Sequence, residues 1–170
     1  MPVSIRDALK SPRDRQWIQA QYPAYLEDLS QMSMNTGVFP ATSEVQAELM
    51  ARWFADDSSY PLIILKDEQP AGFALVSRPP RNRRDQIDFH LAEFFITTRS
   101  RRLGIGRDAA QLIFNRFAGT WEITEFVHNK GAVSFWRAIL MEYTGGKFTE
   151  RVAHGEVHQT FTSANRQRSR

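Results

Sequence analysis

The sequence predicts a mixed α/β (α+β) fold, in which a single, mostly antiparallel sheet of six to seven strands carries helices on both faces. Two observations lead to this fold class. Apolar residues recur at helical spacing through most of the first 54 residues, and short apolar runs bounded by turn residues follow them. Further along, strand-then-helix segments interrupt the run of strands. This order is typical of one mixed sheet covered by helices.

The chain is expected to open with a short strand at residues 3–6, followed directly by a helix. Ser11 has the side chain of a helix N-cap, and Pro12 fits the first helical position. The helical pattern continues to about Ser30, with a break or kink predicted at Pro23. These signals place the first helix immediately after the first strand.

Turn residues divide the rest of the chain. Residues 32–41 are predicted to form a loop, and a second helix follows to about residue 54, with Val45, Leu49 and Trp53 spaced four apart. Strands are predicted at 61–65, 72–76, 87–97, 123–127, 147–152 and 157–162. Helices are predicted at 107–117 and 132–141, and the strand at 87–97 is expected to be the longest.

Composition indicates a soluble globular protein. The chain has 170 residues, 42% of them hydrophobic and 24% charged, and we expect one domain at 1–162 with a disordered basic tail at 163–170. The absence of cysteine excludes disulfides, thiolate metal sites and a cysteine nucleophile, and no metal site is predicted. Neither a signal peptide nor a run of about 20 apolar residues is present, so a cytoplasmic location away from membranes is expected.

A basic loop with two glycines is the strongest functional signal. The segment Arg101-Arg102-Leu103-Gly104-Ile105-Gly106 follows a predicted strand and precedes a predicted helix. Free backbone N–H groups and the helix dipole favour an anion at such a helix start, and glycines allow close approach of a phosphate. Arginines add charge-assisted hydrogen bonds. The loop therefore predicts a site for a phosphorylated ligand.

One interpretation of the loop is a dinucleotide-binding fingerprint. Gly104-x-Gly106-x-x-Ala109 matches that pattern, and Glu125 lies about where a ribose-binding acid is sought. However, seven residues separate Ile96 from the first glycine, and too little chain follows to build two nucleotide-binding halves. These features disfavour a dinucleotide-binding protein.

The second interpretation includes the arginine in the motif. The pattern Arg101-x-x-Gly104-x-Gly106 between a strand and a helix resembles the central motif of the GNAT family of N-acetyltransferases. A second family segment, Asn-x-x-Ala-x-x-Phe-Tyr, is matched by Asn129-Lys-Gly-Ala132-Val-Ser-Phe135-Trp136. The hairpin around 67–72 is similar to the family's second and third strands. The resemblance extends over roughly residues 3–160.

The resemblance implies a GNAT-like sheet whose two central strands, here 87–97 and 123–127, splay apart to admit acetyl-CoA as co-substrate. Backbone amides from 102 to 107 would hold the pyrophosphate, and a strand N–H near Phe95 or Ile96 would polarise the thioester carbonyl. Asn129 would bind the pantetheine arm or order the next helix. The residues expected to bind acetyl-CoA are Phe94, Phe95, Ile96, Arg101, Arg102, Leu103, Gly104, Ile105, Gly106, Arg107, Asn129, Phe135 and Trp136.

Two residues of the 87–97 strand are candidates for the general base. Glu93 is a carboxylate within an otherwise apolar strand, and His90 has an intrinsic pKa suited to proton transfer. Strand alternation places them on opposite faces unless a bulge intervenes. His128 is a weaker third choice. For the acid, the family's usual tyrosine falls at Trp136, whose indole cannot serve, so either another group acts or the thiolate departs unassisted.

These inferences predict an N-acyltransferase that moves acetyl from acetyl-CoA to a primary amine by direct attack in a ternary complex. The expected partner is a small-molecule or peptide amine, with a homodimer as an open option and with neither nucleic acid nor membrane. By family analogy the segment 31–40 and the preceding helix would line the acceptor side, where Glu27 and Asp28 could attract a cation. The alternatives are a CoA-binding module without catalysis, the dinucleotide-binding protein and a nucleic-acid binder that would use the arginines of 81–84 and of the tail.

Overall fold

The computed structural model describes residues 2–32, 43–80 and 86–164. Four α-helices lie in these ranges: α1 (Pro12–Met32), α2 (Ser43–Ala55), α3 (Ile105–Arg116) and α4 (Lys130–Thr144), with a 3₁₀ turn at Thr98–Ser100. The strands are β1 (Val3–Asp7), β2 (Ser59–Lys66), β3 (Gln69–Ser77), β4 (Phe89–Ile96), β5 (Gly119–Phe126), β6 (Thr149–Ala153) and β7 (Glu156–Ser163).

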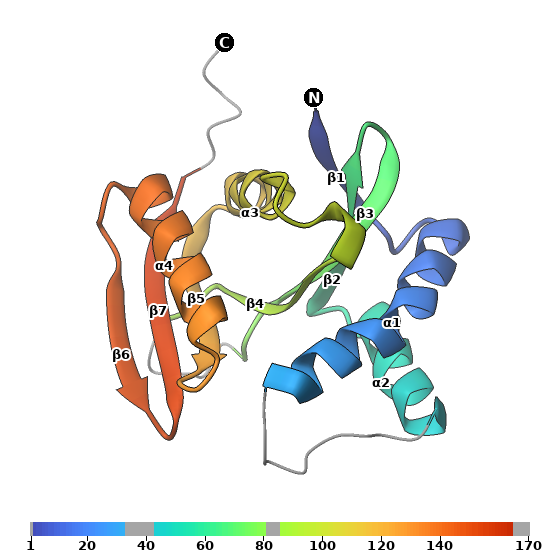
Figure 1. Ribbon diagram of the computed structural model, residues 1–170, viewed down its shortest axis with the longest axis horizontal. Helices are drawn as coiled ribbons and strands as arrows, with labels where there is room; N and C mark the ends of the chain where they lie inside the picture. Colours follow the sequence, from blue (N-terminus) through green and yellow to red (C-terminus); the bar gives the residue numbers. More distant parts are fainter. Residues whose placement is uncertain (1, 33–42, 81–85, 165–170) are drawn as a thin grey trace.

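All seven strands belong to one sheet in the order β1-β2-β3-β4-β5-β7-β6 (Figure 1). Every neighbouring pair is antiparallel except β4 and β5, which run parallel. The β2–β3 hairpin turns at Asp67 and Glu68, both at positive φ, which matches the primed turn that suits strand twist. The predicted mixed, mostly antiparallel sheet is confirmed.

Helices cover the two faces of the sheet with separate apolar clusters. On one face α1 and α2 pack against inward residues of β3 and β4, including Phe73 and Phe95. On the other face α3 and α4 pack against a larger cluster that contains Trp121, Phe114 and Phe161. Because side chains alternate along a strand, neighbouring residues of one strand contribute to opposite clusters.

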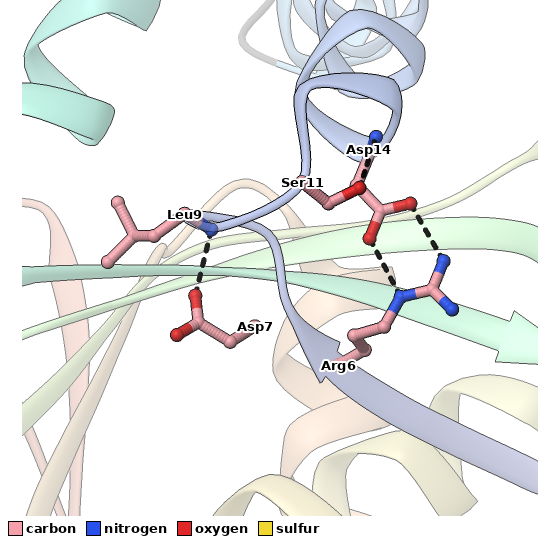
Figure 2. A network of polar contacts seen from close by, with 5 residues as sticks. All are labelled: Arg6, Asp7, Leu9, Ser11 and Asp14. Carbon is pink, nitrogen blue, oxygen red and sulfur yellow. Dashed lines mark hydrogen bonds and ion pairs between the residues drawn. The ribbon is translucent and has the colours of Figure 1, made fainter.

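A bidentate ion pair fixes the start of α1 against β1 (Figure 2). The guanidinium of Arg6 donates from Nε and Nη2 to the two carboxylate oxygens of the buried Asp14, each at 2.8 Å. The backbone N–H of Asp14 donates to Oγ of Ser11 at 3.2 Å, which confirms the predicted cap. Asp7 accepts from the N–H of Leu9 at 2.8 Å. These contacts set the position of α1 and therefore of every residue it brings to the site.

A bulge in β4 changes which side chains share a face. Leu75 of β3 pairs with Glu93, whereas its neighbour Val76 pairs with Leu91, so one extra residue of β4 lies between them. Farther back, Ser77 pairs with His90. Residues 75 and 77 point to the same face, so the bulge places His90 and Glu93 on one face. Simple alternation would have separated them.

α1 continues through Pro23, and its two halves run at an angle in Figure 1, as expected of a kink rather than a break. Two sequence-based details are corrected. β4 begins at Phe89 and is shorter than the nine-residue β3. In α2 the residues buried in the cluster are Met50 and Trp53, whereas Val45 and Leu49 of the predicted stripe are exposed.

The predicted domain boundary falls inside β7. Ser163 still belongs to that strand, is buried, and accepts from the indole N–H of Trp121 at 3.1 Å. The sheet therefore continues one residue into the segment predicted as a tail. Of the loop predicted at 32–41, Met32 is instead the last residue of α1, and 33–41 lie outside the described residues, as do tail residues 165–170.

Candidate active site

The site begins where β4 and β5 separate. These parallel strands pair only through Phe89 with Trp121 and His90 with Glu122, and then diverge. A cavity of about 700 Å³ opens in the gap. Its lining comes from α1, β4, the loop before α3, the end of β5 and the first turns of α4. The splay expected from the family resemblance is therefore present, and it joins both faces of the sheet in one cavity.

The loop at 101–104 presents backbone amides to this cavity. Gly104 is the N-cap of α3 with φ of 74°, and Arg102 is also left-handed with φ of 63°. No side chain caps the helix start, and a Cβ on Gly104 would meet open space. Gly106 lies in the first turn, where a Cβ would come 3.1 Å from the ring of Phe135. The α3 N-terminus thus offers uncapped N–H donors at an open surface, as an anion site requires.

The three arginines near the loop differ in their contacts. Arg101 donates to the backbone oxygen of Ile96 at 3.0 Å and pairs with Asp28 of α1. Arg107 pairs with Glu142 of α4. Among the described residues, Arg102 has no ion pair within 4.0 Å, and it is exposed. Arg101 therefore ties β4 to α1, while Arg102 is the arginine with charge available for a bound anion.

The edge of β4 that faces the gap carries unpaired backbone groups. The N–H of Thr97 donates to Ala71 of β3 at 2.9 Å, so by alternation Phe95 also directs its N–H and C=O toward β3. Phe94 and Ile96 direct theirs toward the gap. Of these, the Ile96 carbonyl already accepts from Arg101. The backbone expected to meet the pantetheine arm is thus that of Phe94 and Ile96 rather than Phe95.

The second motif forms the α4 side of the cavity. Asn129 accepts from the N–H of Ala132 at 3.1 Å, which makes it the N-cap of α4. Trp136 is buried and packs edge-on against Phe94 and Phe135, with ring centroids 5.0 Å apart in each case. Of the residues predicted to bind acetyl-CoA, all line the cavity except Leu103, whose side chain is 64% exposed. At Leu103 only the backbone N–H is placed to contact a bound anion.

Glu93 lies in the cavity and is supported by α1. The hydroxyl of Tyr25 donates to its carboxylate, and Tyr25 packs on Phe73 and Phe95. Burial raises the pKa of Glu93 to about 7. A carboxylate with that pKa and one firm donor can exchange a proton near neutral pH. Sequence reasoning did not single out Tyr25, because its helical spacing is also that of an ordinary core residue.

His90 shares the face of Glu93 but does not line the cavity. Its Nδ1 lies 3.7 Å from Oε1 of Glu122, and Nδ1 of His158 lies 3.5 Å from the same oxygen. The three residues form a polar group on the open face of β4, β5 and β7. The role of His90 as a base therefore stays a prediction, and its ring lies beside the carboxylate of Glu122.

Glu125 is a second acidic residue of the cavity. It is only 7% exposed, and among the described residues neither carboxylate oxygen has a hydrogen-bond partner. Burial and, to a smaller extent, the charge of Glu150 raise its pKa to about 8, against the opposing effect of Arg137. Alternation along β5 puts Glu125 on the inward face with Trp121 and Ile123, a signal available in the sequence. From the sequence, Glu125 was considered only as a ribose-binding acid.

The acceptor side is only partly described. Asp28 lines the cavity but is paired with Arg101, and Glu27 is exposed outside the lining. Residues 33–40 of the expected acceptor loop lie outside the described residues. Within the described ranges, no group of three or more acidic or histidine side chains is arranged to hold a metal ion. No helix in those ranges is long and apolar enough to cross a membrane.

Comparisons with known proteins agree with this geometry. Residues 15–140 match the family model described as Acetyltransferase (GNAT) family. An acetyltransferase from Thermus thermophilus matches with a TM-score of 0.70 and 13% identity, covering 95% of this chain and 97% of that one. A spermidine N-acetyltransferase from Vibrio cholerae, solved with CoA and spermine, matches at 0.65 and 10% identity over 95% of both chains.

A third solved structure is the PaiA N-acetyltransferase from Thermoplasma acidophilum in complex with coenzyme A. It matches with a TM-score of 0.59 and 12% identity, over 95% of this chain and 99% of that one. No curated protein sequence matches the chain. At these identities the solved structures establish a common fold, while the family model covers most of the sequence.

Proposed function

The chain belongs to the GNAT family of acetyltransferases, and on that premise we propose that it transfers acetyl from acetyl-CoA to a primary amine by direct attack in a ternary complex. The observation that carries the proposal is the single cavity, which joins the uncapped α3 N-terminus to Glu93 through the β4–β5 gap. The chain has no cysteine, so it lacks the thiol that an acyl-enzyme route would most readily use.

The donor half of the cavity fits the diphosphate of CoA. Gly104 leaves open space where a side chain would block a phosphate, and its left-handed backbone turns successive amides outward. Arg102 adds an exposed cation beside them. Phe94 and Ile96 offer backbone N–H groups along the gap for the pantetheine arm, in the manner of an added strand. When bound, acetyl-CoA supplies an acyl group activated as a thioester.

Glu93 is the proposed base. An alkyl ammonium has a pKa near 10.4, so the acceptor must lose a proton before its nitrogen can attack. Glu93, with its pKa raised to about 7 by burial, accepts that proton better than an ordinary carboxylate would. Tyr25 donates to the same carboxylate and so fixes its direction. His90 is the alternative base, and its place outside the cavity lining makes it second to Glu93.

The acceptor is proposed to be a cationic amine, small or peptidic. The lining also contains Glu93 and Glu156, whose carboxyl groups favour a positive charge. The spermine found in the Vibrio cholerae enzyme supports a polyamine as the first candidate. A cytoplasmic location and a homodimer are part of the same proposal.

Thermal unfolding tests the donor assignment. At about 100-fold excess over Kd, acetyl-CoA should stabilise the protein by roughly 2.7 kcal/mol, whereas NAD should not. Gly104→Glu should abolish this stabilisation, because the new carboxylate blocks and repels the diphosphate. Gly155→Glu is the matched control, since Gly155 has a similar φ of 77° and open surroundings but lies outside the cavity lining. Stabilisation by NAD instead of acetyl-CoA would contradict the proposal.

A turnover screen tests the acceptor. Release of free CoA is measured with acetyl-CoA and a panel of polyamines, amino acids, aminoglycosides and peptides. A cationic amine should give the highest kcat/KM. Tight acetyl-CoA binding without turnover on any amine would favour a CoA-binding module over an enzyme.

A further inference from the structure

We propose that Glu125 is the proton donor to the leaving thiol, an inference that rests on the proposed acetyl transfer. The residue has the placement that this role requires. It lies near the end of β5, opposite Val157 of β7, on the sheet face that α3 and α4 cover. Glu93 lies on the other face, beneath α1. The two carboxyl groups therefore border one cavity from opposite sides of the sheet.

The surroundings of Glu125 favour its protonated form. Arg137 of α4 is the nearby cation, but it donates to Glu150 of β6 from Nε at 3.2 Å and from Nη2 at 2.8 Å. Gln159 of β7 also donates to Glu150, at 2.9 Å, and its own Oε1 is buried without a partner. Glu125 thus lies near a second carboxylate, that of Glu150, whose charge disfavours ionisation of Glu125. Among the described residues, no N–H or O–H is bonded to it that would stabilise an anion.

A neutral carboxyl at this place has a chemical use. The acceptor enters this step as the neutral amine, because the first proton of its ammonium form has passed through Glu93 to solvent. As the amine nitrogen bonds to the acyl carbon, Glu93 takes the second proton from nitrogen, the C–S bond breaks and its electron pair goes to sulfur. Glu125 then gives its proton to sulfur, so the products are the amide and the thiol of CoA. Exchange with solvent returns a proton to Glu125 and removes one from Glu93. The balance needs no other reactant.

The role also accounts for a departure from the family pattern. Trp136 stands where the family usually has its acidic tyrosine, and here its ring is packed between Phe94 and Phe114. An indole N–H does not act as a proton donor of this kind. Trp136 and Glu125 both line the cavity next to α4. We thus assign the donated proton to Glu125 of β5, whereas the family's usual tyrosine stands at the α4 position of Trp136.

The first test compares ligand binding with and without the sulfur. Calorimetry measures Kd for CoA and for desulfo-CoA at pH 7 and pH 9.5, in the wild type and in Glu125→Gln. If Glu125 lies beside the sulfur, its ionisation at high pH disfavours the thiolate, so CoA should weaken several-fold more than desulfo-CoA in the wild type. Glu125→Gln should remove most of that difference. An equal pH response in both proteins would overturn the proposal.

The second test uses the reaction itself. Glu125→Gln should lower kcat by about 10-fold, less than the roughly 10² to 10⁴-fold typical of general acids, because a thiol of pKa near 8.5 leaves readily. Glu150→Gln keeps Glu125 in place but frees Arg137 to pair with it, so the alkaline fall in kcat should move to lower pH. An unmoved alkaline limb would overturn the proposal even if Glu125→Gln does not fold. If the wild type itself neither binds CoA nor turns over, the proposed function fails instead.

Discussion

The two buried carboxylates of the cavity, Glu93 and Glu125, differ in what surrounds them. Glu93 has the Tyr25 hydroxyl as a donor, and burial raises its pKa to about 7. Glu125 has no hydrogen-bond partner among the described residues, and burial with the charge of Glu150 raises its pKa to about 8. Burial raises both pKa values, and the charge of Glu150 adds to the effect only at Glu125. The difference teaches that a neighbouring charge can give two buried carboxyls different roles, with Glu93 accepting a proton and Glu125 keeping one to give.

Each carboxylate depends on a different part of the fold. Tyr25 reaches Glu93 because α1 is anchored by the Arg6–Asp14 pair at its start and by Arg101 near its end. Glu125 depends on the β5–β7–β6 side, where Glu150 occupies Arg137. A substitution in the contacts of α1 should therefore change the pKa of Glu93 alone, and a substitution on the β5–β7–β6 side should change the pKa of Glu125 alone.

The largest expected effect comes from Glu93→Gln. Loss of the base should lower kcat by about 10² to 10⁴-fold, because the amine must then lose its proton to water. The Kd for acetyl-CoA should stay within about 2-fold, since the substitution does not touch the α3 N-terminus. His90→Gln is the comparison variant, and steady-state kinetics should show a much smaller loss. If His90→Gln has the larger effect, the base is His90 and the comparison fails.

The next effect is on stability. Both carboxyls have folded-state pKa values above the ordinary 4.5, so each costs the folded state nothing below that pH and progressively more as pH rises to its folded pKa. Glu125→Gln should thus raise the free energy of unfolding, with a gain that grows from about pH 5 to pH 8, at most about 1.4 kcal/mol per pH unit. For Glu93→Gln the gain should level off near pH 7. Urea unfolding across pH measures both, and a gain that shrinks with rising pH would contradict the assignments.

Tyr25→Phe should change the pKa of Glu93 and leave that of Glu125 unchanged. Without the hydroxyl donor the ionised form of Glu93 is less stable, so the acidic limb of kcat should move upward by about one pH unit, given that hydrogen bonds to charged groups contribute about 1.5 to 3 kcal/mol. The alkaline limb should stay in place. Tyr22→Phe is a matched control, because burial and the Glu93 charge raise the pKa of Tyr22 without a hydrogen bond to Glu93 being present. Equal shifts in both variants would show that Tyr25 has no special contact.

The smallest expected effect separates the two arginines of the donor loop. Arg102→Met should weaken acetyl-CoA binding by roughly 3- to 10-fold, because its exposed charge is available to the diphosphate. Arg101→Met should leave that Kd nearly unchanged and lower the melting temperature, since Arg101 bonds Ile96 and Asp28. Calorimetry and thermal unfolding of the two variants decide between these roles. The reverse result would place Arg101, not Arg102, at the phosphates.

Local signals predicted much of this molecule. The spacing of Gly104 and Gly106 between a predicted strand and a predicted helix located the donor loop. This was possible because the left-handed residue, Gly104, and the uncapped amides of α3 are neighbours in the sequence. Ser11 and Asn129 act as helix caps for the same local reason. Glu93 was found because a carboxylate in an apolar strand is costly without a purpose.

The rest depends on contacts between distant segments. The bulge beside Ala92 depends on how β4 pairs with β3, and no residue type in β4 predicts it. Tyr25 and Glu93 are 68 positions apart, and Arg101 and Asp28 are 73 apart, so neither pair could be read from local patterns. Glu125 was visible as an inward-facing acid, but its lack of a partner follows only from the pairing of Glu150 with Arg137.

The pH dependence of kcat in the wild type, Glu93→Gln and Glu125→Gln, on one saturating amine, tests the central claim most directly. The wild type should give a bell-shaped profile whose apparent pKa values lie near 7 for Glu93 and near 8 for Glu125. Glu93→Gln should lose the acidic limb and Glu125→Gln the alkaline limb. A profile in which both variants keep both limbs, or in which both lose the same one, would contradict the division of roles between the two faces of the sheet.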